Sequence, residues 1–295
     1  MHDPFSLSLQ GLLSQLLVGL ISGSFYALLS LGLAVIFGLL NVVNFAHGAF
    51  YTAGAFVAYV LLEHAGIGFW PALVLAPLAV FALGVAVERT MLRRLYTLDP
   101  LYGLLLTFGI ALIVQGLLRI QYGSSGLPYP TPPVLEGGHE LPFMFLPTYR
   151  AWVIVFSVSV SAATWYGIER TKIGSYLRAG TENPALVQAF GVNVPWMRTL
   201  TYGFGAALAA TAGVLAAPIY RVNPMMGQDQ IIVVFAVVVI GGMGSILGSI
   251  VTGFGLGLVE AMTKVIYPPA SETVVFLVMA IVLLVKPAGL FGKDG

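Results

Sequence analysis

The feature that most constrains this chain is a run from residue 4 to residue 62 that contains no Asp, Glu, Lys or Arg. A helix that crosses the hydrocarbon core of a membrane needs about 20 residues at a rise of about 1.5 Å each. The run therefore has room for at least two spans. A soluble domain has about a quarter of its residues charged, whereas only 8% of these 295 residues are charged and 58% are hydrophobic. This composition excludes a soluble enzyme and a disordered chain.

Further charge-free segments occupy 64–87, 100–118, 151–168, 199–220, 230–259 and 273–285. A membrane β-barrel would show short segments of alternating hydrophobicity instead, and only helices or closed barrels satisfy their backbone in lipid. We therefore predict an all-α polytopic membrane protein, with residues 1–295 forming a single transmembrane domain of eight or nine helices over 12–38, 44–62, 69–87, 101–120, 151–168, 199–219, 230–247, 249–264 and 272–286.

The segment 230–259 is too long for one upright span and contains seven glycines. Glycine is unfavourable in a helix interior because the unfolded chain loses more backbone freedom there. We therefore expect a broken or re-entrant helix near 241–257, with two helices meeting close to Gly244 and Gly248 as one form of it.

Basic residues are enriched in the cytoplasmic loops of membrane proteins. Orienting the chain by this rule places the C-terminus and the loop 169–198 inside the cell, and the loop 121–149 outside. The N-terminus lies outside if there are nine spans. The residues assigned to the cytoplasmic side are Arg89, Arg93, Arg94, Arg170, Lys172, Arg178, Arg198, Lys286 and Lys293.

The outer loop, 121–149, contains six prolines and four glycines that block a regular helix. It is either a solvated connection or a docking loop for an outer partner.

The inner loop, 169–198, is the most polar stretch between spans. Asn183 is a suitable N-cap with Pro184 at the first helical position, and Glu182 lies where the helix dipole favours a negative charge. We predict a helix of about two turns from residue 185 to residue 190, ended by Gly191. It offers Leu186, Val187 and Phe190, which either pack back onto the membrane face of the chain or dock into another subunit.

No catalytic set emerges from the sequence. The only Gly-Lys pair, at 292–293, is not part of a phosphate-binding Gly-x-x-x-x-Gly-Lys-Ser/Thr motif. No cysteine is present for thiolate or Cys-based metal chemistry, and the net charge of +1 does not suit nucleic-acid binding. A serine protease built from Ser22, Ser24 or Ser124 with His47 has no support in the spacing. We expect a non-enzyme without a metal or cofactor of its own.

Polar residues inside a membrane are costly and often functional. Asn41, Asn44 and His47 recur at intervals of three, followed by Gly48. One interpretation is an interrupted turn that lines a translocation pathway. The alternative is local: Asn44 caps the second span, and neutral His47 bonds a backbone carbonyl.

Two more groups of residues bear on transport. Gly244 and Gly248, like Gly253 and Gly257, have the spacing that lets helices approach closely. These glycines serve either close helix packing or a gating hinge.

The ionisable residues nearest the spans lie at span ends, within snorkelling reach of an interface: Glu88, Arg119 and Glu260. No carboxylate is placed deep in a span, which disfavours a proton- or sodium-coupled carrier.

Several segments resemble the permease subunits of branched-chain amino acid ABC importers, of the LivH type. The resemblance covers nearly the whole chain through GLLNVVNFAHG at 38–48, Glu88-Arg89, the loop from 178–180 to 191–193, GAALAA at 205–210, GGMGSILG at 241–248 and KPAGLFG at 286–292. Each motif alone is weak, but their order and spacing together are specific.

The resemblance implies a permease in the inner membrane of a bacterium. Its partners would be a homologous second permease, two cytoplasmic ATPase subunits that bind the ATP, an outer substrate-binding protein and membrane lipid, without nucleic acid. Leucine, isoleucine and valine would be the cargo, with urea or short amides as the alternative within the family. A stand-alone channel, a secondary carrier and a membrane scaffold are the competing classes. In related loops a coupling helix contacts the ATPase, and the corresponding residues here are Arg178, Ala179, Gly180, Glu182, Asn183, Phe190 and Gly191.

Overall fold

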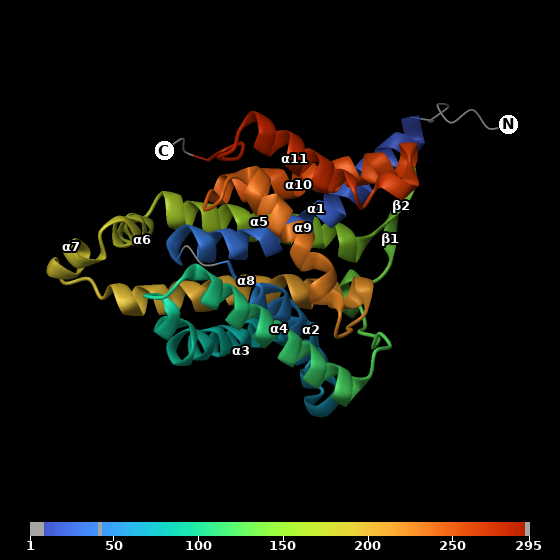
Figure 1. Cartoon of the computed structure of the whole chain (residues 1–295). Coiled ribbons are helices and arrows are strands. Elements are labelled where there is room, and N and C mark those ends of the chain that lie inside the picture. The colour runs from blue at the N-terminus through green and yellow to red at the C-terminus, as the bar shows by residue number, and fades with distance from the viewer. Residues whose placement is uncertain (1–8, 41–42, 293–295) are drawn as a thin grey trace.

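The computed structural model describes residues 9–40 and 43–292 (Figure 1). Asn41 and Lys293, considered above, lie outside the described residues. The described chain is built almost entirely of helices, which confirms the all-α class. The α-helices are α1 Leu9–Leu40, α2 Ala46–Ala65, α3 Phe69–Thr90, α4 Pro100–Tyr122, α5 Thr148–Glu169, α6 Lys172–Glu182, α7 Pro184–Ala189, α8 Val194–Tyr220, α9 Met226–Gly241, α10 Ile246–Ile266 and α11 Val274–Val285.

Nine of these helices coincide with the nine predicted spans. Within the described residues, α1, α3, α4, α5, α8 and α10 are long and apolar enough to cross a membrane. The helix α2 has 20 residues, whereas α9 and α11 are apolar but have only 16 and 12. At about 1.5 Å per residue α11 reaches only about 18 Å, less than the hydrocarbon thickness. The chain is a multi-pass membrane protein, and its shortest helices do not traverse the core alone.

The predicted break near 241–257 is a short turn between two helices. Gly242 and Gly244 adopt φ values of 99° and 84°, which L side chains rarely tolerate. Ser245 then caps α10, because its Oγ accepts a hydrogen bond of 3.1 Å from the Gly248 N–H. The chain therefore leaves α9 and enters α10 within four residues.

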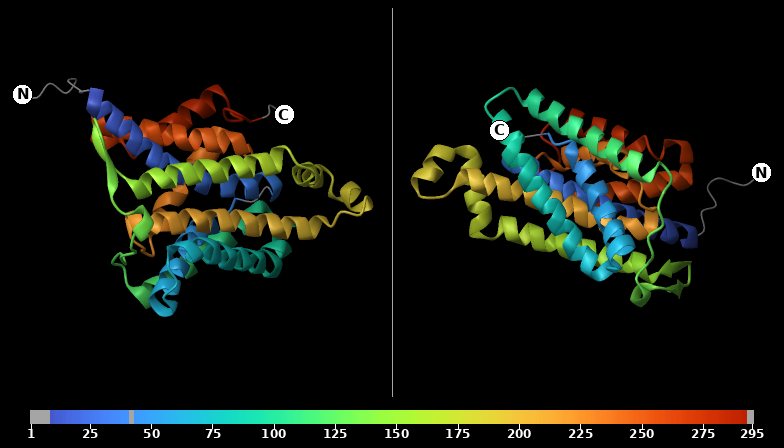
Figure 2. Two further views of the ribbon diagram at one scale, coloured as in Figure 1. Left: turned by 180° about the vertical axis from the view of Figure 1, so that it is seen from behind. Right: turned by 90° about the horizontal axis from the view of Figure 1, so that it is seen from below.

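The helices α1 and α8 form the centre of the bundle and contact each other (Figures 1 and 2). The helix α1 also packs along α10, and α8 also packs against α2 and α3. Side chains of α1 such as Leu28 and Ile36 are fully buried. The helix α4 is peripheral and exposes Ile113 and Leu117 by 63% and 62%. Exposed aliphatic side chains on a long helix are suited to contact lipid.

The two long loops lie at opposite ends of the bundle (Figure 1). Between α4 and α5 the chain forms no α-helix, as its prolines and glycines predicted, but it contains an unpredicted hairpin. Strands β1 Gly138–Leu141 and β2 Met144–Pro147 pair antiparallel, beyond a 3₁₀ turn at Pro133–Leu135. The Ser14 hydroxyl of α1 donates to the Phe143 carbonyl at 2.8 Å and ties the hairpin to the bundle.

The inner loop is more helical than predicted. We expected one short helix there, and the structure has two, because α6 precedes α7. The helix α8 also begins five residues earlier than the predicted span, at Val194. Arg198 lies inside its first two turns, with the guanidinium 5.7 Å from the Tyr96 ring. A charged residue that stacks on an aromatic ring does not end a helix, so the charge map placed this boundary too late.

Candidate functional site

The helices α6 and α7 project from one end of the bundle (Figures 1 and 2). Asn183 begins α7 as predicted, since its Oδ1 accepts a hydrogen bond of 3.0 Å from the Leu186 N–H. Pro184 occupies the first helical position, where a missing N–H costs nothing. Gly191, just beyond the C-cap Phe190, has φ of 83° and turns the chain toward α8. Local capping therefore produces a compact helical tip on the loop.

The apolar residues of this tip divide into one anchor and two free side chains. Val187 is buried against the protein, whereas Leu186 is 54% and Phe190 is 81% exposed. Of the two alternatives, packing of these side chains onto the chain's own bundle therefore applies to Val187 only. A phenyl ring exposed at the end of a projecting helix is available to contact another molecule.

The other predicted coupling residues lie on α6. Arg178 forms an ion pair with Glu169 at 3.2 Å, and both side chains are partly exposed, so the pair adds little stability. Gly180 is buried, and a Cβ there would lie 2.6 Å from the Met197 Cε of α8. Ala179 is half-buried, and Glu182 is exposed at the last residue of α6. Gly180 therefore holds α6 close to α8, while the charged residues face outward.

The loop is connected to the centre of the bundle through α8. Asn193 caps α8 with a hydrogen bond of 3.0 Å from the Trp196 N–H to its Oδ1. From Val194, α8 continues for 27 residues to the opposite end of the molecule. Because a helix is stiff along its axis, a displacement of α7 would be passed directly to the most extensively packed part of the bundle.

Glu88 anchors the same end of α8 to α3. We expected Glu88 to snorkel to an interface, and this prediction is wrong: the residue is 1% exposed. Its carboxylate accepts hydrogen bonds from the Thr199 hydroxyl at 2.6 Å and the Tyr96 hydroxyl at 3.0 Å. A buried carboxylate must be hydrogen-bonded to be tolerated, and the two donors come from α8 and from the segment that follows α3.

Replacing Glu88 with leucine is expected to destabilise the protein by about 1–3 kcal/mol, because the Tyr96 hydroxyl loses its acceptor and the Thr199 hydroxyl keeps only the Pro195 carbonyl. The measurement is the midpoint of unfolding in detergent. Glu63→Leu is the control, since Glu63 is exposed on α2 and its loss should leave the midpoint unchanged. Equal destabilisation by both substitutions would contradict the anchoring role.

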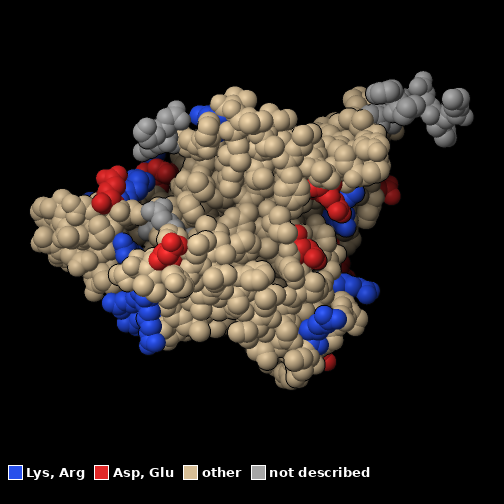
Figure 3. All heavy atoms as spheres, viewed as in Figure 1, with Lys and Arg blue, Asp and Glu red and all other residues tan. Residues whose placement is uncertain are grey.

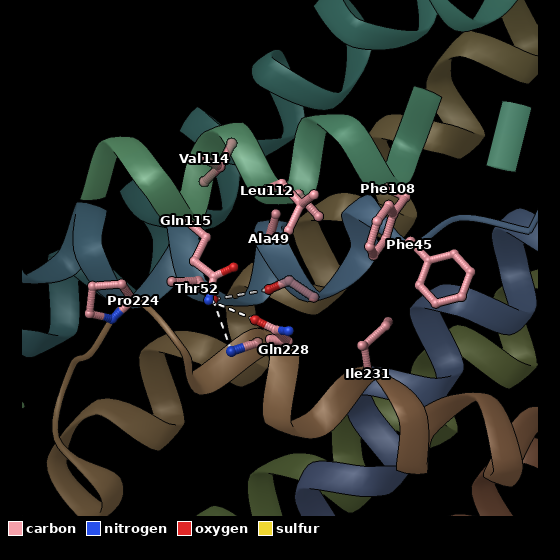
Figure 4. Close-up of a pocket in the computed structure, with 13 residues that line it drawn as sticks. Phe45, Ala49, Thr52, Phe108, Leu112, Val114, Gln115, Pro224, Gln228 and Ile231 are labelled. Carbon is pink, nitrogen blue, oxygen red and sulfur yellow. Dashed lines mark hydrogen bonds between the residues drawn. The ribbon is translucent and has the colours of Figure 1, made fainter. Parts of the chain in front are cut away.

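A small, mainly apolar cleft with a few polar groups lies between α2, α4 and α9 (Figure 4). Gln115 of α4 and Gln228 of α9 point toward each other, with a hydrogen bond of 2.7 Å from the Gln115 Nε2 to the Gln228 Oε1. The Thr52 hydroxyl accepts a hydrogen bond of 3.0 Å from the Gly227 N–H. The cavity volume is about 50 Å³, which holds only a few water molecules. This conformation is therefore closed to a solute of amino-acid size.

Of the four residues predicted to line a pathway, only Gly48 lines this cleft. A Cβ at Gly48 would lie 2.5 Å from the Gly227 carbonyl oxygen, so the glycine allows α2 and α9 to touch. Asn41 lies outside the described residues. Asn44 and His47 are both fully buried elsewhere in the bundle.

Asn44 and His47 form interhelical contacts. The His47 Nε2 lies 2.8 Å from the Leu29 carbonyl oxygen of α1, in agreement with the local alternative. Asn44 does not cap α2: Phe45 is the N-cap residue, and the Asn44 Oδ1 instead accepts a hydrogen bond of 3.2 Å from Tyr202. Within the described residues, the Asn44 Nδ2 and the His47 Nδ1 have no hydrogen-bond partner. Each residue thus retains an unused polar atom that a different conformation could satisfy.

The predicted packing glycines all lie at close approaches. Gly257 meets the backbone of Gly23 in α1, and a Cβ at Gly253 would be 2.6 Å from the Ala27 Cα. Gly244, in the turn before α10, lies against Gly38 of α1, and Gly248, in the first turn of α10, lies against Gly241 of α9. The absence of side chains at Gly253 and Gly257 lets α1 and α10 pack with their backbones nearly in contact.

Residues 15–284 match the family described as branched-chain amino acid transport system / permease component. The chain belongs to this family of permeases. The match includes all nine apolar helices and the α6–α7 loop, so it concerns the architecture described above as a whole.

Individual relatives match this permease over most of its length. The LivH high-affinity branched-chain amino acid transport permease of Escherichia coli (strain K12) is 31% identical over 302 residues, covering 95% of this chain and 96% of LivH. BraD of Pseudomonas aeruginosa, a permease of the same description, is also 31% identical, with the same coverage. LivM of E. coli is 29% identical over 245 residues, covering 75% of this permease and 57% of LivM. No solved structure matches this permease.

Sequence reasoning missed the polar residues of the cleft in this permease. Gln115 is the only Asn or Gln in the charge-free segment 100–118, a signal that could have singled it out. Gln228 and Thr52 carry no such signal, because Gln228 stands beside Asp229 and Thr52 is one of several hydroxyl-bearing residues in the long charge-free run. Their proximity to Gln115 depends on the packing of three helices.

Proposed function

We propose that this permease is the membrane subunit of an ATP-driven importer of leucine, isoleucine and valine. The supporting observation is the similarity to LivH over 95% of this chain and 96% of that protein, with 31% identity. Because the similarity extends over nearly the full length of both proteins, it favours the same transport function rather than one shared segment. The location proposed is the plasma membrane, which in a bacterium with two membranes is the inner one.

We propose that a second, homologous permease completes the pathway. Both LivH and LivM resemble this chain, which supports a pair of related but unequal subunits. ATP would bind to two separate cytoplasmic subunits, because the sequence has no phosphate-binding loop motif. A binding protein on the outer side would deliver the amino acid.

The proposed contact with the ATPase is the tip of α7. Phe190 and Leu186 supply an exposed apolar surface, and Asn183 and Gly191 set the limits of the helix that carries them. An apolar anchor that enters a groove of the partner can carry much of a binding energy. Closure of the ATPase pair would then move α7 and, through Asn193, the N-terminus of α8.

The proposed pathway includes the cleft between α2, α4 and α9. Its walls are mainly apolar, with Phe45 and Phe108 at one end and the glutamine pair at the other (Figure 4). Apolar walls suit an aliphatic side chain, and amide groups suit the polar end of an amino acid. Opening would require α4 or α9 to move, because the closed cleft is too small for this cargo.

Uptake into lipid vesicles tests the proposal. The permease is reconstituted alone, and then with its second permease, the ATPases and the binding protein, and radiolabelled leucine is followed with and without ATP. We expect uptake only from the full assembly with ATP, and competition by isoleucine and valine but not by urea. ATP-independent uptake by the chain alone would reject the importer, and competition by urea would reject the substrate assignment.

Gln115→Leu is expected to raise the KM for leucine uptake by about tenfold, because a lost hydrogen bond to a charged ligand is worth about 1.5 kcal/mol. Gln121→Leu is the matched control: it removes the same amide from the same helix, at an exposed position outside the cleft. The two variants should reach the membrane in equal amounts. An equal KM for leucine uptake in the Gln115→Leu and Gln121→Leu variants would show that the cleft is not part of the pathway.

A further inference from the structure

A second cavity lies at the end of the bundle that carries α6 and α7. It is lined by the end of α3, the 3₁₀ helix that follows it at Leu92–Leu95, and the start of α8. Its volume is about 590 Å³, within the range of ligand pockets. Figure 3 shows basic side chains gathered over this end of the molecule, beside the projecting loop. The lining residues are Arg89, Arg93, Asn193, Pro195, Trp196 and Thr199; we call this cavity the basic cleft.

In the part of the chain that the structure describes, the arginines of the basic cleft have no negative partner. Among the described residues the one ion pair is formed by Arg178 and Glu169, so neither Arg89 nor Arg93 has a carboxylate within 4.0 Å. The nearby carboxylate of Glu88 is already bonded to two hydroxyl groups. Arg89, near the end of α3, and Arg93, in the 3₁₀ helix that follows, both line this cavity and produce a positive potential that favours an anion.

The geometry of Arg89 suits a phosphate. Its guanidinium carbon lies 4.8 Å from the centre of the Trp196 ring, so the stacked group is held in one orientation while its N–H edge stays free to donate. A planar guanidinium presents paired donors that match two phosphate oxygens. The backbone N–H of Trp196 is used by the Asn193 cap, so the arginines are the charged donors of the cleft.

An apolar groove lies between α5, α6 and α8, near the same end of α8. Its volume is about 530 Å³ and its lining is nearly all apolar. Leu200 and Phe204 of α8 line it and are 38% and 40% exposed. They follow Trp196 at intervals of four residues, which places all three along one side of α8. This stripe leads from the basic cleft into the groove.

We propose that the basic cleft and this groove form a binding site for an anionic phospholipid of the cytoplasmic leaflet. Arg89 and Arg93 bind the phosphate, Trp196 marks the depth of the interface, and an acyl chain lies along Leu200 and Phe204. Basic pockets between transmembrane helices on the cytoplasmic side are suited to anionic headgroups. The juxtaposition of an unpaired basic cavity with an apolar groove favours a molecule that has both parts, rather than a free phosphate or an acidic peptide.

Native mass spectrometry of the full-length permease tests the site. The protein, in neutral detergent, is mixed with equal amounts of dioleoylphosphatidylglycerol and dioleoylphosphatidylcholine. We expect preferential retention of phosphatidylglycerol, and about tenfold weaker retention by Arg93→Gln, since a hydrogen bond to a charged group contributes about 1.5 kcal/mol. Arg94→Gln is the matched control, because it removes the same charge from the adjacent exposed residue, which does not line the cleft.

Two further arms separate the sources of the phosphate and test the groove. Leu200→Gln should also weaken phosphatidylglycerol retention, at an unchanged melting temperature, and millimolar glycerol phosphate should not displace the lipid. Equal losses of phosphatidylglycerol retention in Arg93→Gln and Arg94→Gln would show that the lipid responds only to the overall surface charge, and would overturn the proposal. Displacement by glycerol phosphate would overturn it in favour of a free phosphate. Unchanged lipid retention in Arg93→Gln, with loss of a co-purifying subunit, would overturn it in favour of a protein contact.

Discussion

Phe190→Asp is expected to lower ATP-driven leucine uptake at least a hundredfold while the permease still folds and enters the membrane. Phe190 is 81% exposed, so its replacement leaves the bundle intact. In the proposed assembly the ring is buried against the ATPase, where an unpaired carboxylate is costly. A loss of about 2.7 kcal/mol at this contact corresponds to a hundredfold weaker association. The measurements are uptake into vesicles and pull-down of the ATPase from detergent.

Met243→Asp is the control for this variant. Met243 is 58% exposed in the turn between α9 and α10, at the same end of the bundle but outside the loop. The Met243→Asp substitution introduces the same negative charge in place of an exposed apolar side chain, and leucine uptake should be retained. Undiminished ATPase binding by Phe190→Asp would show that the tip of α7 is not the contact. Loss of uptake in both variants would show that the added charge alone is harmful.

Gly253→Leu is expected to prevent stable folding, so that little protein is recovered from membranes. A Cβ at this position would lie 2.6 Å from the Ala27 Cα and N, which are backbone atoms and cannot rotate away. The helices α1 and α10 would have to separate along the most extensive helix contact in the bundle. Overpacking in a core typically costs about 1–3 kcal/mol, and a backbone clash at the central pair of helices should exceed that. Recovery from membranes and elution from a sizing column provide the measurement.

Gly255→Leu provides a matched control on the same helix. A Cβ at Gly255 meets no atom within 4 Å, and leucine has the higher helix propensity. This variant should therefore be recovered at least as well as the native chain. Equal recovery of the Gly253 and Gly255 variants would mean that α1 and α10 are not packed backbone to backbone.

Features governed by nearby residues were predictable from the sequence. The apolar segments located nine helices, and the glycine-rich segment 241–257 indicated a break close to Gly244 and Gly248. Asn183, Pro184 and Gly191 indicated α7, because capping and turn formation depend on residues only a few positions apart. The hairpin at 138–147 and the helix α6 were missed, since both are stabilised by contacts with other parts of the chain and neither has a strong local signal.

The candidate site was less accessible from the sequence. Asn44 and His47 were recognised as unusual polar residues, but their bonds to Tyr202 and Leu29 join different helices. Glu88 was assigned to an interface because span ends usually lie there, and its burial depends on donors from two other segments. The roles predicted for these residues and for the α6–α7 loop stay predictions until transport is measured.

Membrane residence followed from the sequence alone, because nearly sixty consecutive uncharged residues can be accommodated only where water is absent. The helix positions followed as well, since each backbone must satisfy its own hydrogen bonds in lipid. Which polar side chains meet was decided by tertiary structure. Gln115 and Gln228 are far apart in the chain, as are Arg93 and Trp196, and a charge or hydropathy pattern contains no information on how helices rotate about their axes. That rotation is set by interhelical packing, which small residues such as Gly253 and Gly257 permit.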